Sequence, residues 1–217
     1  MKTLLIAGTD TDVGKTIITT ALRAYYQEYY SDLNISLMKL MQTGKQGDGE
    51  FYQRFFDDVV IPLRFDTPVA PPIAADLEGK SIDLGVIWQN LLKLQESQDI
   101  VLIEALGGLG SPITHDLTIA DLAGSWRLDT ILVVPMKLGA IAHTVANVAL
   151  AKHHKVKLKG IVFNCVKPCS EENINHWAPK NLVESLTQVP VLGYFPYVEK
   201  IDNLTDLAKI TADSLRI

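Results

Sequence analysis

The chain has 217 residues, of which 47% are hydrophobic, 21% are charged and 7% are aromatic. This length and composition are typical of one soluble globular domain, and they exclude a disordered or collagen-like chain. Twenty basic and 25 acidic side chains give a net charge of −5. Because a nucleic-acid binder usually carries a basic stripe, we expect no nucleic-acid partner.

The apolar stretches of the chain are short. The first, residues 4–7, is followed by Gly8-Thr9-Asp10, where a secretory signal would continue with apolar residues. No stretch approaches the roughly 20 apolar residues that span a bilayer, so we expect a cytoplasmic protein without a membrane partner. Cys165 and Cys169 lack the second Cys or His pair of a zinc site, and we interpret them as ordinary thiols.

Six apolar runs predict the strands of a sheet. They span residues 4–7, 35–40, 100–103, 130–134, 160–163 and 191–194. Runs that are apolar on both faces are typical of parallel strands covered by helices on both sides. Between them, apolar residues recur at helical spacing over residues 17–29, 84–94, 141–150 and 204–215. This alternation predicts an α/β fold, with a single domain over residues 1–217 and a doubly wound, mainly parallel sheet.

Residues 62–76 contain four prolines and interrupt the alternation. We interpret this segment as a long surface loop. Connections in compact domains are usually shorter, so a loop of this length indicates a functional segment or an excursion over the site.

The segment Gly8–Thr16 has the sequence GTDTDVGKT and lies between the first apolar run and the first helical pattern. Strand, glycine-rich turn and helix in this order are typical of the phosphate loop of P-loop NTPases, although five residues instead of four separate the two glycines. Backbone N–H groups of the turn would face the phosphates, Lys15 would reach the outer phosphates and Thr16 could ligate Mg²⁺. An ordinary glycine turn before a helix is the alternative.

Three charged residues lie near the ends of predicted strands or in the loop beyond them. Glu104 ends the run 100–103, where the carboxyl ends of parallel strands form the ligand crevice of an open α/β sheet. Asp48 lies in a polar, glycine-rich loop and is a second candidate ligand of Mg²⁺, which needs only one or two carboxylates beside phosphates. A solvated role stays open for both acids. For Lys39, at the end of the run 35–40, the residues alone favour a side chain that extends to water.

Taken together, these motifs resemble the dethiobiotin synthetases. The resemblance covers nearly the whole chain in the correct order. It rests on Gly8–Thr16, Lys39 with Thr43-Gly44, Asp48, Val101–Glu104 with Gly107-Gly108, Ile131–Val134 with Lys137-Leu138-Gly139, Asn164, and Leu192-Gly193 with Pro196. Three features differ from the family pattern. Ala105-Leu106 follow Glu104 where a glycine is common, Cys165 follows Asn164 where an acidic residue is common, and Ala142 replaces a polar residue that meets the substrate carboxylate.

The resemblance implies an ATP-dependent ring closure in which 7,8-diaminononanoate and CO₂ or bicarbonate become dethiobiotin. One amine forms a carbamate, the carbamate attacks the γ-phosphate to give a carbamic-phosphoric anhydride, and the second amine closes the ring. No protein nucleophile takes part. The protein positions the reactants and stabilises developing charge, as in phosphoryl transfer generally.

The resemblance also implies roles for individual residues. Lys15 and Lys39 would be catalytic, and Thr16, Asp48 and Glu104 would hold Mg²⁺. The expected nucleotide contacts are Asp12, Val13, Gly14, Lys15, Thr16, Asp48, Glu104, Asn164, Cys165, Pro196, Tyr197 and Val198. The expected substrate contacts are Thr11, Thr43, Gly139, Ala140 and Ile141, the last three supplied by the neighbouring subunit of a homodimer.

Two other classes of function stay open. One is a GTP- or ATP-dependent regulatory switch, because Asp121–Gly124 matches the pattern Asp-x-x-Gly of such proteins. That segment follows polar residues instead of ending a buried strand, and the segment Asn164–Lys167 does not match Asn-Lys-x-Asp. The other is a different small P-loop ligase or kinase.

Overall fold

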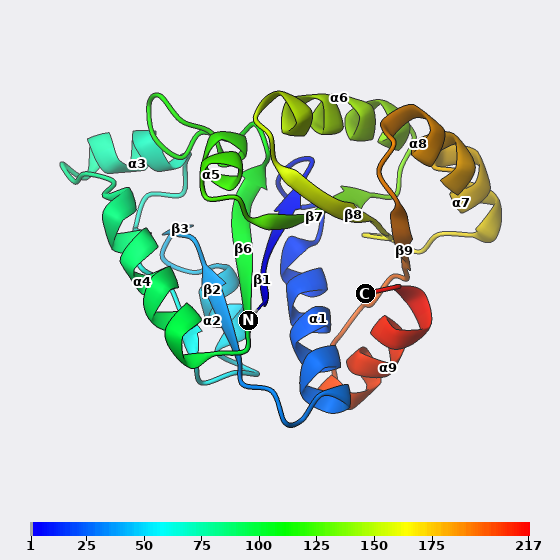
Figure 1. The fold of residues 1–217 in the computed structure, drawn as a ribbon, viewed down its shortest axis with the longest axis horizontal. Coiled ribbons are helices and arrows are strands. Elements are labelled where there is room, and N and C mark those ends of the chain that lie inside the picture. The colour runs from blue at the N-terminus through cyan, green and yellow to red at the C-terminus, as the bar shows by residue number, and fades with distance from the viewer. Residues whose placement is uncertain (1) are drawn as a thin grey trace.

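The computed structural model describes residues 2–217 and places a seven-stranded sheet at the centre of the fold (Figure 1). The strand order is β4-β2-β6-β1-β7-β8-β9, and every neighbouring pair is parallel. The strands are β1 (Lys2–Gly8), β2 (Ile35–Lys39), β4 (Val59–Val60), β6 (Ile100–Gly108), β7 (Asp129–Pro135), β8 (Lys157–Asn164) and β9 (Val191–Phe195). All six predicted strands are therefore present, and the predicted parallel sheet is confirmed.

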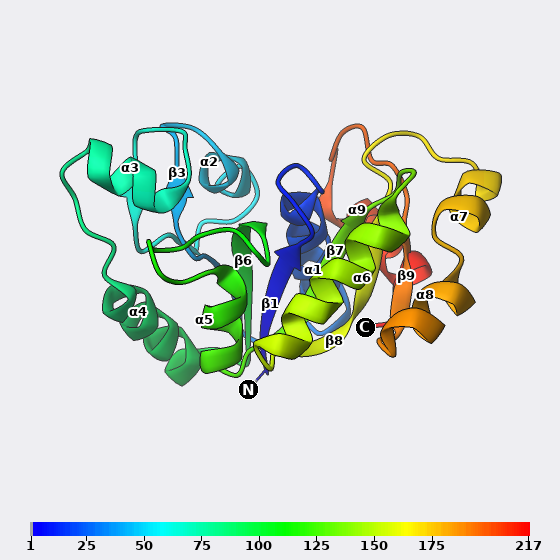
Figure 2. The same cartoon turned by 90° about the horizontal axis from the view of Figure 1, so that it is seen from above.

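Helices cover both faces of this sheet, as a doubly wound fold requires (Figure 2). On one face lie α1 (Lys15–Tyr29) and α9 (Leu204–Ser214). On the other lie α4 (Leu84–Ser97), α5 (Ile119–Ser125), α6 (Ala140–His153) and α8 (Lys180–Thr187). Each of the four predicted helical patterns corresponds to one of these helices. No helix within residues 2–217 is long and apolar enough to cross a membrane.

The period of two along β6 decides which way its side chains point. Val101, Ile103 and Ala105 pack into the core beneath α4, α5 and α6, whereas Ile100 and Leu102 pack into the core beneath α1. Glu104 has the same parity as Leu102 and so points toward the face of α1. The register of β6 with β2 sets Glu104 directly beside Lys39, so strand pairing alone brings these two residues together.

The prediction of a loop over residues 62–76 is wrong in part. The segment contains β5 (Arg64–Phe65), which pairs with β3 (Gln42–Thr43) in a second, two-stranded parallel sheet. It also contains most of α3 (Pro71–Leu77), which begins with two prolines. Proline is tolerated there because the N–H groups of a first helical turn have no partner within the helix. Four further short helices were not predicted, namely α2 (Asp48–Tyr52), α5, α7 (Glu171–Trp177) and α8.

Candidate active site

A cleft of about 630 Å³ lies at the carboxyl ends of β1, β2 and β6. Nine of the predicted site residues line it: Thr11, Asp12, Gly14, Lys15, Thr16, Lys39, Thr43, Asp48 and Glu104. The remaining wall comes from the segment 68–71 and from residues that were not predicted as site residues, among them Met41, Gln42, Leu106 and Ser111. The segment with the prolines thus covers one side of the cleft, as its length indicated.

The phosphate loop is shaped by two close approaches of its glycines. A Cβ on Gly8 would lie 2.8 Å from Val13 Cγ2, and Gly14 has a φ of +86°, which side chains rarely adopt. Gly14 is the N-cap of α1, whose first N–H groups face the cleft. Lys15 bends back over the loop and donates a hydrogen bond to the Asp10 carbonyl at 3.0 Å. Burial lowers the pKa of Lys15 below its ordinary value.

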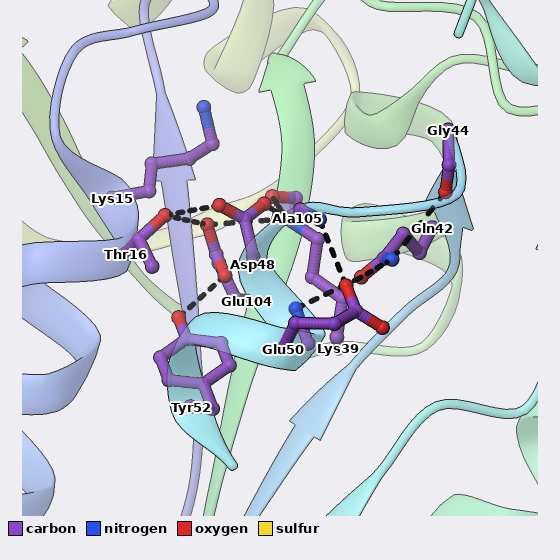
Figure 3. A network of polar contacts seen from close by, with 12 residues as sticks. Lys15, Thr16, Lys39, Gln42, Gly44, Asp48, Glu50, Tyr52, Glu104 and Ala105 are labelled. Atoms are coloured by element: carbon purple, nitrogen blue, oxygen red, sulfur yellow. Dashed lines mark hydrogen bonds and ion pairs between the residues drawn. The ribbon is translucent and has the colours of Figure 1, made fainter. Parts of the chain in front are cut away.

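Thr16 meets both candidate carboxylates (Figure 3). Its hydroxyl oxygen lies 2.7 Å from Asp48 Oδ1 and 3.0 Å from Glu104 Oε1. Glu104 is only 1% exposed, so its alternative role as a solvated strand end is excluded. Three side chains with oxygen atoms that could ligate a metal, one each from α1, α2 and β6, therefore converge beside the phosphate loop.

Lys39 is buried instead of extending to water. Its side-chain nitrogen donates to Asp48 Oδ2 at 2.5 Å, lies 3.1 Å from Glu104 Oε1 and is 3.4 Å from the Ala105 carbonyl oxygen. Burial by itself would lower the pKa of Lys39, but the two carboxylates outweigh it and hold that pKa above its ordinary value. For Asp48 burial likewise opposes ionisation, and the positive charge of Lys39 lowers the pKa on balance. A charged lysine thus stands between two acidic residues in the cleft.

The donor set fits a magnesium ion that is bound together with nucleotide phosphates. No group of three or more His, Cys, Asp or Glu side chains that could hold a metal alone is found within residues 2–217. Mg²⁺ at phosphates takes one or two carboxylates and keeps water molecules, and it prefers hard oxygen ligands. The hydroxyl of Thr16 and the carboxylates of Asp48 and Glu104 meet that requirement.

The predicted contacts to the base do not line the cleft. Asn164 is buried at the end of β8, and its Nδ2 donates to the Val13 carbonyl at 2.9 Å, so it supports the phosphate loop. Cys165 is buried beside it, and burial raises the pKa of its thiol to about 12. After β9, Pro196 and Tyr197 are exposed and Val198 is half-buried. The start of α6, with Gly139, Ala140 and Ile141, also lies outside the cleft.

Four polar contacts of α2, the helix that carries Asp48, were missed from the sequence. Gln42 Oε1 accepts from the Gly49 N–H, and its Nε2 donates to Glu50, which in turn accepts from Arg64 at 2.6 Å. These contacts hold the start of α2. Burial opposes ionisation of Glu50, but its hydrogen bonds lower its pKa to about 2. Tyr52, at the end of α2, donates to Glu104 Oε2. No sequence signal indicated this role, because Tyr52 lies among aromatic residues that are typical of a core.

The Asp-x-x-Gly segment serves a structural purpose in this chain. Asp121 is the third residue of α5 and accepts from the N–H and hydroxyl of Thr118, the residue that caps the helix. It also pairs with His154 at 2.9 Å. Asp121 is absent from the cleft lining, so the arrangement does not favour a switch protein.

Comparisons with known proteins agree with this arrangement. A family profile described as an AAA domain matches residues 2–205. The ATP-dependent dethiobiotin synthetase of Gloeothece citriformis is 56% identical, and the alignment covers 97% of this chain and 94% of the relative. That of Crocosphaera subtropica is 57% identical over 98% of this chain and 96% of the relative, and that of Bacillus cereus is 30% identical over 92% and 85%.

Solved structures agree in fold alone. A chain of the MinC:MinD cell division protein complex of Aquifex aeolicus superposes with a TM-score of 0.60 at 13% identity, covering 97% of this chain and 88% of that one. A ParA family ATPase from Chlorobium tepidum gives a TM-score of 0.59 at 11% identity, covering 98% and 92%. With the sequence relatives matched over almost their full length, the chain belongs to the dethiobiotin synthetase family.

Proposed function

We propose that the chain closes the ureido ring of dethiobiotin from 7,8-diaminononanoate and CO₂ at the expense of ATP. Its full-length similarity to ATP-dependent dethiobiotin synthetases supports this activity over a regulatory switch. The observation that carries the proposal is the position of Lys39, a charged lysine buried beside a phosphate loop that already has its own lysine. A second cation is needed where two anions, a carbamate and a phosphoryl group, must approach each other.

The reaction divides into three steps. One amine of the substrate attacks CO₂, which gives a carbamate and releases a proton. A carbamate oxygen attacks the γ-phosphorus and the bond to ADP breaks, which forms the carbamic-phosphoric anhydride. The second amine then attacks the carbamoyl carbon, and inorganic phosphate leaves as the ring closes.

The residues of the cleft would share this work between positioning and charge stabilisation. The N–H groups of the phosphate loop and Lys15 would hold the outer phosphates, with Asp12, Val13 and Gly14 forming the loop. Thr16, Asp48 and Glu104 would hold Mg²⁺, which supplies charge neutralisation at the phosphates. Lys39 would stabilise the charge that develops between carbamate and phosphoryl group, while Thr11 and Thr43 would bind the reacting end of the substrate.

The remaining predicted contacts concern the base and the far end of the substrate. The side-chain nitrogen of Asn164 donates to the Val13 carbonyl, and its amide oxygen would accept a hydrogen bond from the base. Cys165 and the segment 196–198 flank the same end of the sheet and would complete the base site. The apolar segment 68–71 and Leu106 offer a wall for the alkyl chain of the diamine.

Diamine-dependent ADP release is the first expected result. With Mg²⁺, ATP and bicarbonate, addition of 7,8-diaminononanoate should stimulate ADP release and produce one cyclic urea per ADP, because the carbamate is the acceptor of the phosphoryl group. Mass spectrometry of the product checks the ring. Equal ADP release without diamine would contradict the proposal, and a stable phosphorylated diamine would indicate a kinase instead.

The far carboxylate of the substrate is remote from the amines that would react beside Lys39, so it needs donors of its own. We propose a two-fold homodimer in which Gly139, Ala140 and Ile141 at the start of α6 reach the substrate of the neighbouring subunit through backbone N–H groups. The surface of α6 supports this proposal, because Leu138 is 81% exposed and Val145 is 36% exposed, with Ala142 exposed between them. An apolar surface of this kind suits a subunit interface.

A charge at Ala142 should therefore weaken both dimerisation and diamine binding. Sedimentation at micromolar concentration should give about twice the chain mass of 23.9 kDa for the native protein and a larger monomer fraction for Ala142→Glu. The KM for diamine should rise while ATP binding stays unchanged. Ala212→Glu is the matched control, since Ala212 is an exposed alanine of α9 on the opposite face of the sheet. A fully active monomer would refute the shared site.

A further inference from the structure

The short helix α2 delivers two side chains to the cleft region from one turn. Asp48 is its first residue and Tyr52 its last, and a spacing of four residues sets them on the same side of the helix. Figure 3 shows both side chains directed toward Glu104 and Thr16. Tyr52 is fully buried and packs with Leu37 and Phe56. It does not line the cleft, so it has no access to substrate or nucleotide.

The two oxygens of Glu104 have different partners. Oε1 faces the cleft and meets Thr16 and Lys39 at 3.0 and 3.1 Å. Oε2 points inward and accepts from the Tyr52 hydroxyl at 2.5 Å, the one side-chain donor to this oxygen within residues 2–217. Removal of that hydroxyl would leave a buried carboxylate oxygen unpaired, which is costly in a low-dielectric interior.

A carboxylate that is held at one oxygen by a buried donor keeps the other oxygen in a fixed direction. Without that donor the carboxylate can rotate about its last bond, and the ligating oxygen no longer has a defined position. Partners of this kind orient the ligands of metal sites, and their loss typically weakens metal binding or activity about 10- to 100-fold.

We propose that Tyr52 is a positioning residue that holds Glu104 with Oε1 directed at the site where metal and nucleotide phosphates bind. The inference rests on the proposed role of Glu104 as a ligand of Mg²⁺. Because α2 also carries Asp48, the same helical turn positions both carboxylates, one as its own side chain and the other through a hydrogen bond.

Tyr52→Phe tests this role because it removes the hydroxyl and keeps the ring that packs with Leu37 and Phe56. The matched control is Tyr194→Phe, which removes a hydroxyl that donates to the Ala178 carbonyl at 2.7 Å, away from the cleft. The dissociation constant of Mn²⁺ from the complex of protein and ADP is measured by electron paramagnetic resonance. It should rise about 10- to 100-fold in Tyr52→Phe and stay unchanged in Tyr194→Phe.

Two further measurements separate positioning from a general structural role. Binding of ADP in the presence of EDTA should be the same in both variants and the native protein. In steady state, Tyr52→Phe should need more Mg²⁺ for half-maximal ADP release. Unchanged Mn²⁺ affinity would overturn the proposal. The proposal would also be overturned if Tyr52→Phe weakened metal-free ADP binding as much as Mn²⁺ binding, or if Tyr52→Phe no longer folded. Either result would show that the hydroxyl supports the fold in general.

The outcome is independent of the proposed ring closure. Native protein that binds Mn²⁺ and ADP but shows no diamine-dependent ADP release would refute the ring closure and leave the role of Tyr52 testable by Mn²⁺ binding. Native protein that shows diamine dependence, together with unchanged Mn²⁺ affinity in Tyr52→Phe, would refute the role of Tyr52 alone.

Discussion

Replacement of Lys39 by alanine should lower the turnover number by at least about a hundredfold, the typical cost of losing one preorganised group that stabilises developing charge. Lys39 is buried, charged and held by Asp48, Glu104 and the Ala105 carbonyl, so its charge has a fixed place in the cleft. Lys15 remains in place and is separately held by the Asp10 carbonyl. The loss should therefore appear in the turnover number much more than in ATP binding.

Lys152→Ala is the control for Lys39→Ala. Its side-chain nitrogen donates to the Thr187 carbonyl at 2.9 Å, so it is also a lysine with a hydrogen-bond partner, but it is exposed and lies outside the cleft. Calorimetry with ADP should show a change below about tenfold, or 1.4 kcal/mol, for either variant. If Lys39→Ala folds and keeps the native turnover number, Lys39 has no part in the chemistry.

Gly14→Ala should strongly weaken nucleotide binding and destabilise the fold. Gly14 has a φ of +86°, and an added Cβ would lie 2.0 Å from Asn164 Nδ2. The side chain of Asn164 is buried and supports the Val13 carbonyl, so it cannot move aside without losing that hydrogen bond. Backbone strain and overpacking together should lower the free energy of unfolding by about 2–5 kcal/mol. ATP affinity should fall by at least about a hundredfold, equivalent to about 2.7 kcal/mol.

Gly79→Ala separates the two causes of this effect. Gly79 has a φ of +60°, but nothing lies within 4 Å of an added Cβ. In this variant only backbone strain should lower the free energy of unfolding, by about 1–2 kcal/mol, and ATP should bind normally. Urea unfolding gives the stabilities, and calorimetry gives the ATP affinities. Similar losses in the two variants would show that the contact with Asn164 is unimportant.

The fold was predictable from the sequence because its six long strands are apolar on both faces and alternate with amphipathic helices. The short elements were not. The five residues of α2 are too few to show a period, and Pro71 and Pro72 indicated a loop although they begin α3. In each case residues outside the element stabilise it, for α3 the strands β3 and β5. Gln42 and Arg64 hold the start of α2 through Gly49 and Glu50.

The site was predictable where a residue ends a buried strand or belongs to the phosphate-loop pattern. Glu104 follows from its place at the end of a buried strand, and Lys15 and Thr16 follow from the loop pattern. For Lys39 the residues alone favoured water, and only its register opposite Glu104 on the next strand explains its burial. Tyr52 lies among aromatic residues, so the sequence indicates a core residue, and the structure does place it in a hydrophobic cluster. Its hydroxyl gains a role only from the approach of β6.

The register that sets Lys39 beside Glu104 also bears on how the protein folds. Thr16 and Glu104 are 88 positions apart in the sequence, and β6 lies between β1 and β2 in the sheet. Parallel pairing over such separations is slow, because the entropy of closing a long loop is lost before the contacts form. The phosphate loop can form locally, but the cluster of Lys39, Asp48 and Glu104 cannot exist until β6 has docked. Recovery of turnover during refolding would therefore follow the insertion of this strand.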